Sequence, residues 1–371
     1  MIYFDSAATT LRKPRSVSRA VRCAMTTMAS PGRGEHGPAA RAGNILLACR
    51  QRAACLFQVG EPDRVVLTFN ATHGLNMAIR SLVNPGHTVL LSGWEHNAVT
   101  RPLGSIPGVQ VRTIRTPLFR PDAFLEALDR QLDPSVDVMV CTQVSNVFGY
   151  VLPVEEVAAL CRSRGVPLIV DASQGAGLLP IRLEEWGADF VAMPGHKGLY
   201  GPQGTGLLLC RKGGEPLMEG GTGSDSRSQA MPDFLPDRLE AGTHNVPGAA
   251  GLLAGMGFVR EVGMGRLLGH ETHLKDLAGE GLAKLPGIQV FQTRGPGQTG
   301  VLSFRAARWD VGELADRLDR QGIALRAGLH CAPTAHDTAG TGETGTLRLS
   351  FSAFNTAREV ESFLNVMKAI V

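Results

Sequence analysis

The sequence lacks three features that would place it in a specialised class of protein. Its seven cysteines include no Cys-x-x-Cys pair, which argues against a disulfide framework or a structural zinc site and favours a reducing compartment. No apolar run approaches the ~18 residues of a membrane span, and no signal peptide is recognisable at the start. The formal net charge of +3 is too small to indicate nucleic acid or a membrane surface as a partner. We therefore expect a cytoplasmic protein that binds no metal.

The length and composition are those of an ordinary globular protein. The chain has 371 residues, enough for two domains of about 100–200 residues each. Hydrophobic residues make up 43% of the chain and charged residues 19%, so a large buried core is expected.

Between about residues 60 and 210, short apolar runs alternate with helical patterns. These runs contain few polar side chains, as strands do when helices cover both faces of a sheet. The alternation predicts an α/β fold with a mostly parallel sheet. The expected strands are 64–69, 87–92, 109–114, 136–141, 166–171, 188–193 and 201–209, and the expected helices are 72–82, 122–132 and 154–164.

After about residue 250 the pattern becomes that of a smaller α+β domain. One long helical pattern covers residues 249 to about 285, and Thr356 and Glu359 match a capping box at the start of a last helix. The other expected elements are strands at 288–291, 300–304 and 347–351 and a helix at 311–321.

The change of pattern predicts two domains. We expect a large domain at residues 15–250 and a small C-terminal domain at residues 251–371. The N-terminal strip, residues 1–14, is expected to join the small domain or to line the interface.

Polar side chains follow five of the expected strands, at the points where those strands end. Ligands of open α/β sheets gather at the carboxyl ends of the strands. The five positions supply an acid, an amide, a helix start suited to an anion, an imidazole and an amine: Asp171, Asn146, Thr72, His96 and Lys197.

This set of groups matches the needs of pyridoxal phosphate. The cofactor takes a lysine for its aldehyde, an acid for its pyridinium nitrogen and a helix N-terminus for its phosphate. A buried or cation-adjacent lysine has the lowered pKa that an amine needs to attack a carbonyl, and Lys197 lies between two expected strands. Each residue also has a simpler structural explanation, such as a helix cap for Asp171 or Thr72, a turn for Asn146, or a structural role for His96. Their joint order favours the cofactor.

Short motifs in a fixed order extend this pattern over nearly the whole chain. With them the sequence resembles the class V aminotransferase family, specifically its cysteine desulfurase-like branch, which includes selenocysteine lyases. The motifs are Tyr3-Phe4-Asp5-Ser6-Ala7-Ala8-Thr9-Thr10, Glu95-His96-Asn97-Ala98-Val99, Asp171-Ala172-Ser173-Gln174, Gly195-His196-Lys197-Gly198, Glu240-Ala241-Gly242-Thr243, Arg326-Ala327-Gly328-Leu329-His330-Cys331-Ala332 and Arg348-Leu349-Ser350.

The resemblance implies a fold-type I pyridoxal phosphate-dependent transferase with a seven-stranded sheet in its large domain. Lys197 would be the Schiff-base lysine and the acid and base at the substrate's α-carbon. Asp171 would pair with the pyridine nitrogen, Gln174 would hydrogen-bond the ring oxygen, and His96 would stack on the ring and take part in proton transfer.

The resemblance also implies how phosphate and substrate are held. Thr72, the amides of Ala71 and Thr72, and His196 would bind the phosphate. The substrate carboxylate would be bound by three further residues, of which Arg348 would act bidentately: Asn146, Arg348 and Arg326. Members of the family form homodimers, in which residues near Thr222 would reach the partner's cofactor phosphate.

Cys331 indicates the type of reaction. The resemblance makes it a nucleophile that takes sulfur from L-cysteine, leaving L-alanine and a persulfide on Cys331. The neighbouring imidazole of His330 would favour the reactive thiolate. The other six cysteines are expected to be small buried hydrophobic residues. A thiol or a sulfur-carrier protein would then accept the sulfur.

Other readings of the same residues stay open. A selenocysteine lyase or another C–S lyase would use the same fold, and in a class V aminotransferase or epimerase Cys331 would be incidental. A non-catalytic scaffold is a further alternative, which the joint presence of Lys197, Asp171 and Arg348 disfavours.

The sequence departs from the family pattern at three places near the phosphate and the ring. Pro194 stands where a Ser or Thr hydroxyl is common, and His73 stands where Glu is frequent. In the acidic motif, Ala172 and Ser173 occupy positions where Gly is usual. These departures bear on phosphate affinity and substrate choice.

Overall fold

A seven-stranded sheet forms the centre of the larger part of the molecule. The computed structural model describes residues 1–32, 34, 36–224 and 227–371. The strands lie in the order β2-β8-β7-β6-β5-β3-β4; β8 runs antiparallel to both its neighbours, and the remaining pairs are parallel. This confirms the predicted mostly parallel α/β sheet. The strands are β2 (Val65–Thr68), β3 (Thr88–Ser92), β4 (Gln110–Ile114), β5 (Val138–Thr142), β6 (Leu168–Asp171), β7 (Phe190–Pro194) and β8 (Gly206–Cys210).

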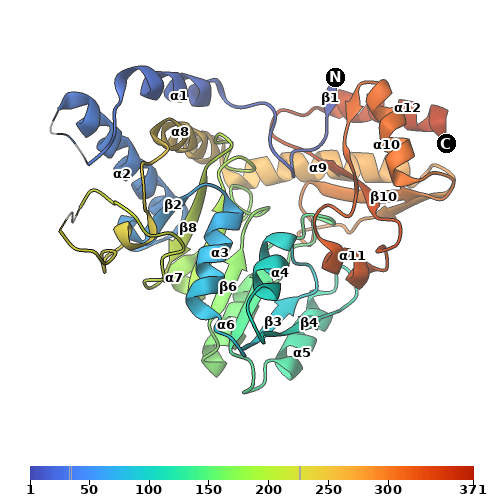
Figure 1. Cartoon of the computed structure of the whole chain (residues 1–371). Coiled ribbons are helices and arrows are strands. Elements are labelled where there is room, and N and C mark those ends of the chain that lie inside the picture. The colour runs from blue at the N-terminus through green and yellow to red at the C-terminus, as the bar shows by residue number, and fades with distance from the viewer. Residues whose placement is uncertain (33, 35, 225–226) are drawn as a thin grey trace.

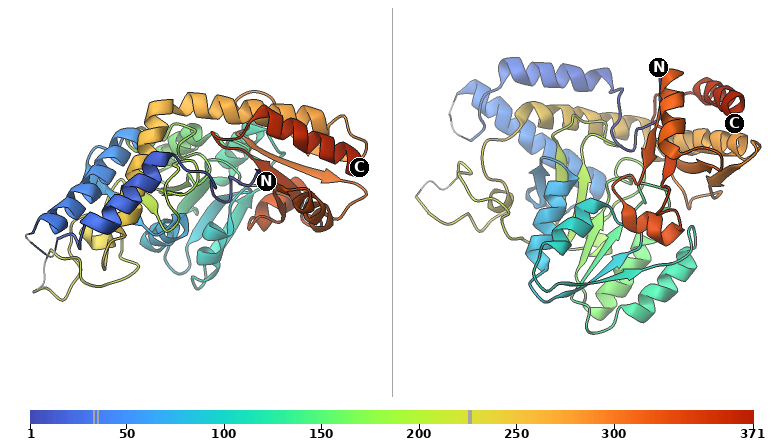
Figure 2. Two further views of the ribbon diagram at one scale, coloured as in Figure 1. Left: turned by 90° about the horizontal axis from the view of Figure 1, so that it is seen from above. Right: turned by 45° about the vertical axis from the view of Figure 1, so that its right-hand side comes forward.

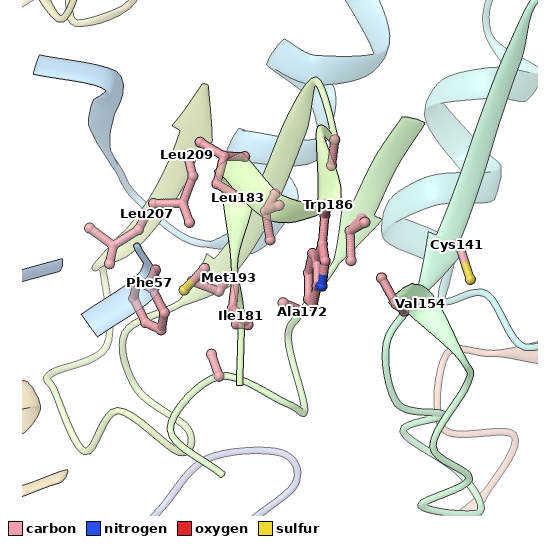
Figure 3. Close-up of a cluster of buried hydrophobic side chains, with 14 of the residues drawn as sticks. Phe57, Cys141, Val154, Ala172, Ile181, Leu183, Trp186, Met193, Leu207 and Leu209 are labelled. Carbon is pink, nitrogen blue, oxygen red and sulfur yellow. The ribbon is translucent and has the colours of Figure 1, made fainter. Parts of the chain in front are cut away.

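Helices cover both faces of this sheet, which explains its apolar strands. In β7, Val191 and Met193 join the core on one face, while Phe190 and Ala192 join the core on the other. Figure 3 shows part of the first core, with Phe57 beside Met193, Leu207 and Leu209. The first core includes side chains from α2 (Gly37–Phe57), α5 (Pro121–Gln131), α6 (Val154–Arg164) and α8 (Val246–Val262), among other helices. The second core includes side chains from α3 (Ala71–Leu82) and α4 (Asn97–Gly104).

The C-terminal part has a sheet and an apolar core of its own. Its four strands lie in the order β12-β13-β10-β9, and Phe4 from the N-terminal segment is fully buried among its apolar side chains. Both termini lie in this part of the molecule (Figure 1, Figure 2). The elements are α9 (Met264–Leu282), β9 (Ile288–Phe291), β10 (Val301–Ala306), α10 (Val311–Arg320), β12 (Arg326–Gly328), α11 (Pro333–Ala339), β13 (Thr346–Ser350) and α12 (Ala357–Ile370).

The N-terminal segment is tied to the C-terminal part by a short parallel pair. Strand β1 (Ile2–Tyr3) pairs with β11 (Ile323–Ala324), and Asp5 forms a parallel bridge with Ser350. The segment therefore lies against the core of the C-terminal part, beside β13. The domain boundaries at residues 15–250 and 251–371 stay predictions.

The long helical pattern expected at residues 249–285 is two helices. Gly263, with a φ of 90°, ends α8, and α9 begins at the next residue. Glycine adopts this backbone conformation without strain, whereas other residues do not, so the chain can turn at Gly263. The apolar pattern continues on both sides of the break, which is why the sequence indicated a single helix. The sequence patterns also did not predict five other helices: α1 (Arg15–Thr27), α2, α4, the short α7 (Leu183–Trp186) and α11. Two 3-10 turns, η1 (Pro62–Arg64) and η2 (Asp237–Leu239), complete the elements of the described chain.

Two local predictions have clear outcomes. The capping box is confirmed: the side chain of Thr356 accepts from the Glu359 N–H, and the Glu359 carboxylate accepts from the Thr356 N–H. The expectation of six buried cysteines is wrong for two of them, because Cys23 and Cys55 are exposed, like Cys331. All seven cysteines are free thiols.

The residues that the structure describes contain neither a membrane-spanning helix nor a cluster of metal ligands. No helix among them is long and apolar enough to cross a membrane. Within the same ranges, no three or more His, Cys, Asp or Glu side chains gather in a way that could hold a metal ion.

A buried ion pair connects three separate segments of the larger part. The carboxylate of Glu240 accepts two hydrogen bonds of 2.6 Å from the guanidinium of Arg50 on α2. The same carboxylate accepts from the Leu67 N–H on β2, and Arg50 also donates to the Val65 carbonyl. Both side chains are less than a tenth exposed. Each buried charge is therefore stabilised by the opposite charge of its partner, and removing one would leave the other unpaired.

We expect Glu240→Ala to lower the free energy of unfolding by about 3–5 kcal/mol, because the change leaves the charge of Arg50 buried and unpaired. Urea denaturation measures the effect. The matched control is Glu280→Ala, which breaks the exposed pair with Arg294 and is expected to cost less than about 1 kcal/mol. Equal losses in the two variants would contradict the assignment of Glu240 as a buried structural counter-ion.

Candidate active site

A pocket opens at the carboxyl edge of the seven-stranded sheet. Strands β7, β6, β5 and β3 are neighbours, and their ends lead to Lys197, Asp171, Asn146 and His96. The pocket encloses about 490 Å³ of empty space, including its opening to solvent. It brings together eight of the predicted residues: Ala71, Thr72, His96, Asn146, Asp171, Gln174, His196 and Lys197.

The loop that carries Lys197 is held by close backbone packing. A Cβ at Gly195 would collide with Thr205 Oγ1, and a Cβ at Gly198 would collide with the Ala176 carbonyl oxygen. Only glycine allows these approaches, so the two glycines fix the path of the loop on either side of the lysine.

The N-terminal segment holds the same loop from the other direction. The carbonyl oxygen of His196 accepts hydrogen bonds from the Thr10 N–H, from Thr10 Oγ1 at 3.0 Å and from Lys13 Nζ at 2.9 Å. Thr9 Oγ1 lies 3.0 Å from His196 Nδ1. Residues 9–13 therefore help to position Lys197.

The environment of Lys197 favours the neutral amine. Burial lowers the pKa of Lys197 to about 8; the carboxylate of Asp171 opposes this shift, and the guanidinium groups of Arg348 and Arg326 add to it. A lysine with such a pKa supplies a substantial fraction of nucleophilic amine near neutral pH.

Asp171 is the last residue of β6 and is not a helix cap. Its Oδ1 accepts the N–H of Ser173 at 2.9 Å, which fixes the carboxylate at the strand end. The side chain is 2% exposed and lines the pocket. Gln174 is anchored beside it, because its Nε2 donates to the Ala7 carbonyl at 3.0 Å.

His96 caps α4 and is held as a neutral imidazole. Its Nδ1 accepts the Ala98 N–H at 3.0 Å, which requires that nitrogen to be unprotonated and assigns the ring proton to Nε2. Burial lowers the pKa of His96 to about 4, an effect that Asp171 opposes and that Lys197 and the nearby arginines reinforce.

The start of α3 forms the opposite end of the pocket. Asn70, not Thr72, is the N-cap: its side chain accepts the His73 N–H at 2.8 Å. Ala71 and Thr72 in the first turn line the pocket, where the free N–H groups of a helix start attract anions. His73 points elsewhere and stacks on Phe69 with 4.6 Å between ring centroids, while Pro194 lines the pocket.

Asn146 and Arg348 are in direct contact. Arg348 Nη1 donates to the Asn146 carbonyl at 2.8 Å, and Asn146 Nδ2 donates to the His330 carbonyl at 2.8 Å. Arg348 is 1% exposed, and its Nη2 lies 2.6 Å from Oδ1 of Asp5. The sequence did not predict this contact of Asp5 with Arg348, although Asp5 belongs to the motif at residues 3–10.

Cys331 lies on a strained loop close to the pocket wall. His330 and Cys331 have φ values of 49° and 57°, in a region that side chains other than glycine rarely adopt. The Cys331 carbonyl accepts the N–H of Asn97 at 2.7 Å, which ties the loop to the residue after His96. The Cys331 side chain remains exposed.

The structure does not support the expectation that the His330 imidazole favours the thiolate of Cys331. His330 Nε2 lies 3.1 Å from the Thr346 carbonyl, and burial lowers the pKa of His330 to about 2. A neutral ring engaged elsewhere supplies no charge to the sulfur. Instead, Arg326 Nη2 lies 3.5 Å from Cys331 Sγ, so the group facing the thiol is a guanidinium.

Thr222 is not part of this pocket. It lies in the loop after β8, where its hydroxyl is 2.9 Å from that of Ser224. The role of Thr222 at the cofactor of a partner subunit stays a prediction.

The whole chain matches one family of enzymes. The model of the "Aminotransferase class-V" family matches residues 2–363. The chain belongs to the class-V aminotransferase family. A probable cysteine desulfurase of Xylella fastidiosa is 33% identical to it, over 99% of this chain and 90% of that protein.

Further relatives agree with this placement in the class-V family. The cysteine desulfurase CsdA of Escherichia coli is 31% identical, over 99% of this chain and 93% of its own length. The apo structure of a cysteine desulfurase from Thermococcus onnurineus has a TM-score of 0.91 at 29% identity, covering 100% of this chain and 94% of its own. The fold resemblance expected from the motifs is thereby confirmed.

We expect the amine of Lys197 in the cofactor-free protein to become reactive as the pH rises through about 8, because burial lowers its pKa and only the neutral amine reacts. Reductive methylation with formaldehyde, followed by peptide mass spectrometry, measures the extent of modification at each pH. The exposed Lys212 serves as the internal reference for reagent delivery. A half-maximal extent at Lys197 close to pH 10 would contradict the lowered pKa.

Proposed function

We propose that this chain is a pyridoxal phosphate-dependent cysteine desulfurase, which converts L-cysteine to L-alanine and leaves the sulfur as a persulfide on Cys331. The observation that carries the proposal is the placement of Cys331. It is an exposed thiol beside a guanidinium, on a loop anchored at Asn97 next to the pocket residue His96. The names of the relatives support the same reaction.

The residues in the pocket fit the cofactor. A helix start suits its phosphate, the fixed carboxylate of Asp171 suits its ring nitrogen, and Lys197 supplies an amine of lowered pKa for its aldehyde. Gln174, His96 and His196 border the same space. When bound there, the cofactor supplies an aldehyde that captures amino groups and a ring that accepts electrons.

The protein residues then divide the work of binding and proton transfer. Arg348 and Asn146 hold the α-carboxylate of the amino acid, which fixes the Cα–H bond relative to Lys197. Lys197 takes the proton from Cα and returns it at the end. Neutral His96, with its proton on Nε2, would donate a hydrogen bond into the pocket, and the side chain of Asp171 would pair with the ring nitrogen of the cofactor.

The sulfur step takes place at Cys331. The thiolate attacks the sulfur of the substrate, an S–S bond forms, and the Cβ–S bond breaks. The electron pair of the broken bond stays on Cβ, which takes a proton and becomes the methyl group of alanine. The guanidinium of Arg326 stabilises the anionic sulfur during this exchange. Cysteine and the enzyme thiol are thus converted to alanine and the enzyme persulfide, and the reaction needs no outside oxidant.

The proposal includes a homodimer and a sulfur acceptor. Large apolar side chains, among them Phe69 and Met218, are exposed around a hollow next to the start of α3. Such an apolar surface supports contact with a second copy of the chain. In that dimer, Thr222 of each copy would reach the Lys197 pocket of the other. The exposure of Cys331 supports transfer of its sulfur to a thiol or a carrier protein. We propose a cytoplasmic location.

We expect Cys331→Ala to abolish sulfide release from L-cysteine, because the substrate sulfur loses its acceptor, while binding of L-cysteine at Lys197 and the cofactor persists. Alanine, sulfide and the mass of the peptide containing residue 331 are measured after incubation with L-cysteine. The unaltered protein gains one sulfur atom on that peptide, and the control Cys55→Ala, which removes another exposed thiol, behaves likewise.

Two outcomes would overturn this assignment. Full sulfide release by Cys331→Ala would exclude Cys331 as the nucleophile. Consumption of a keto acid in step with alanine formation would indicate an aminotransferase. Parallel assays with selenocysteine and cystine separate the desulfurase from a selenocysteine lyase or another C–S lyase.

A further inference from the structure

Asp5 connects the N-terminal segment to the substrate side of the site. Its Oδ1 lies 2.6 Å from Arg348 Nη2, and the Arg348 side chain is 1% exposed against 20% for Asp5. The two residues are 343 positions apart in the chain, so only the tertiary fold brings them together.

The hydrogen bonds of Arg348 leave one nitrogen of its guanidinium group, Nε, without a partner. Nη1 donates to the Asn146 carbonyl at 2.8 Å and Nη2 donates to Asp5. Nε is buried and has no hydrogen-bond partner among the described residues. Because a guanidinium is planar and its N–H groups form a rigid fork, two fixed contacts set the direction of the third.

The backbone of Asp5 is held in place by several contacts. Its carbonyl accepts the Ala8 N–H and the Tyr3 hydroxyl, each at 3.1 Å, and its backbone bridges to Ser350 next to the strand residue Leu349. Asp5 is not one of the residues that line the pocket. Arg348 does not line it either, but it lies directly behind Asn146, which does. The Asp5 carboxylate therefore supports Arg348 from behind the pocket wall and does not fill the space of the pocket.

The charges around Arg348 explain why such support is needed. Burial lowers the pKa of Arg348, and the nearby guanidinium of Arg326 acts in the same direction. Asp5 opposes both effects. Without this carboxylate, two guanidinium groups and the amine of Lys197 would lie close together with less compensation, and repulsion would displace the Arg348 side chain.

We propose that Asp5 is a positioning residue: it holds the Arg348 guanidinium behind Asn146 and keeps its unpaired Nε–H for the α-carboxylate of the amino-acid substrate, and so sets the preference for ligands that carry this carboxylate. The inference rests on the proposed function for the role of Arg348. Asp5 acts through Arg348 and takes no part in bond making or breaking.

The test compares the binding of two ligands that differ in the carboxylate. Calorimetry of the holoenzyme measures the affinity for L-alanine and for ethylamine. In Asp5→Asn, which keeps the shape but loses the charge, we expect alanine binding to weaken about tenfold and ethylamine binding to change less than about twofold. Asp5→Glu, which restores the charge, is expected to recover most of the alanine affinity. The KM for cysteine should rise with alanine's dissociation constant, with kcat changed far less.

The matched control removes a carboxylate of the same type from an exposed ion pair. Asp122→Asn breaks the Arg120–Asp122 contact and is expected to leave both affinities unchanged. Equal weakening of alanine and ethylamine by Asp5→Asn would show a merely structural role and overturn the proposal. Unchanged or tighter alanine binding would overturn it as well, the latter by showing that Asp5 competes with the ligand.

Failure of the proposed reaction would be recognised separately. The unaltered protein is assayed for sulfide release from L-cysteine, which tests the desulfurase. The comparison of alanine with ethylamine needs no sulfur chemistry. It therefore decides the role of Asp5 whether or not sulfide is released.

Discussion

The site depends on one packing constraint, the close backbone contact of the Lys197 loop with its neighbours. Gly195 packs against Thr205 and Gly198 packs against the carbonyl of Ala176, at distances where no side chain fits. Held in this way, the lysine lies at the carboxyl edge of the sheet, in surroundings that lower its pKa to about 8. A looser loop would let the amine reach water, where it would be charged and unreactive.

Burial also sets the charges of the groups around that lysine. His96 is neutral because it is buried and because its Nδ1 accepts a backbone N–H. Two of the cations have a carboxylate nearby: Lys197 is close to Asp171, and Arg348 forms an ion pair with Asp5. Arg326, a third cation, lies beside the sulfur of Cys331. Cys49 and Cys161, whose pKa burial raises to about 12, lie in the hydrophobic core and are unsuited to attack a sulfur atom.

The sequence predicted the sheet and the location of the pocket well because both follow from local patterns. Fully apolar strands are expected when both faces are covered, and polar residues at strand ends meet at one edge of a parallel sheet. The same local reasoning failed where its signal is ambiguous. The pattern at residues 249–285 continues through the break at Gly263, and α2 carries glycine, alanine and arginine around most of its surface. Its apolar contacts are visible only once the sheet is in place.

What the sequence by itself determined is the set of chemical groups: an amine, an acid, an imidazole, a helix start and a thiol, in an order typical of the class-V aminotransferases. What only the tertiary structure decided is which groups face one another. His330 is adjacent to Cys331 in the chain, yet its ring bonds Thr346, while Arg326 reaches the sulfur. Asp5 and Arg348, at opposite ends of the chain, form a pair of 2.6 Å. The physical reason is that charge interactions and hydrogen bonds depend on distances of a few ångströms, which long-range packing sets and sequence separation does not.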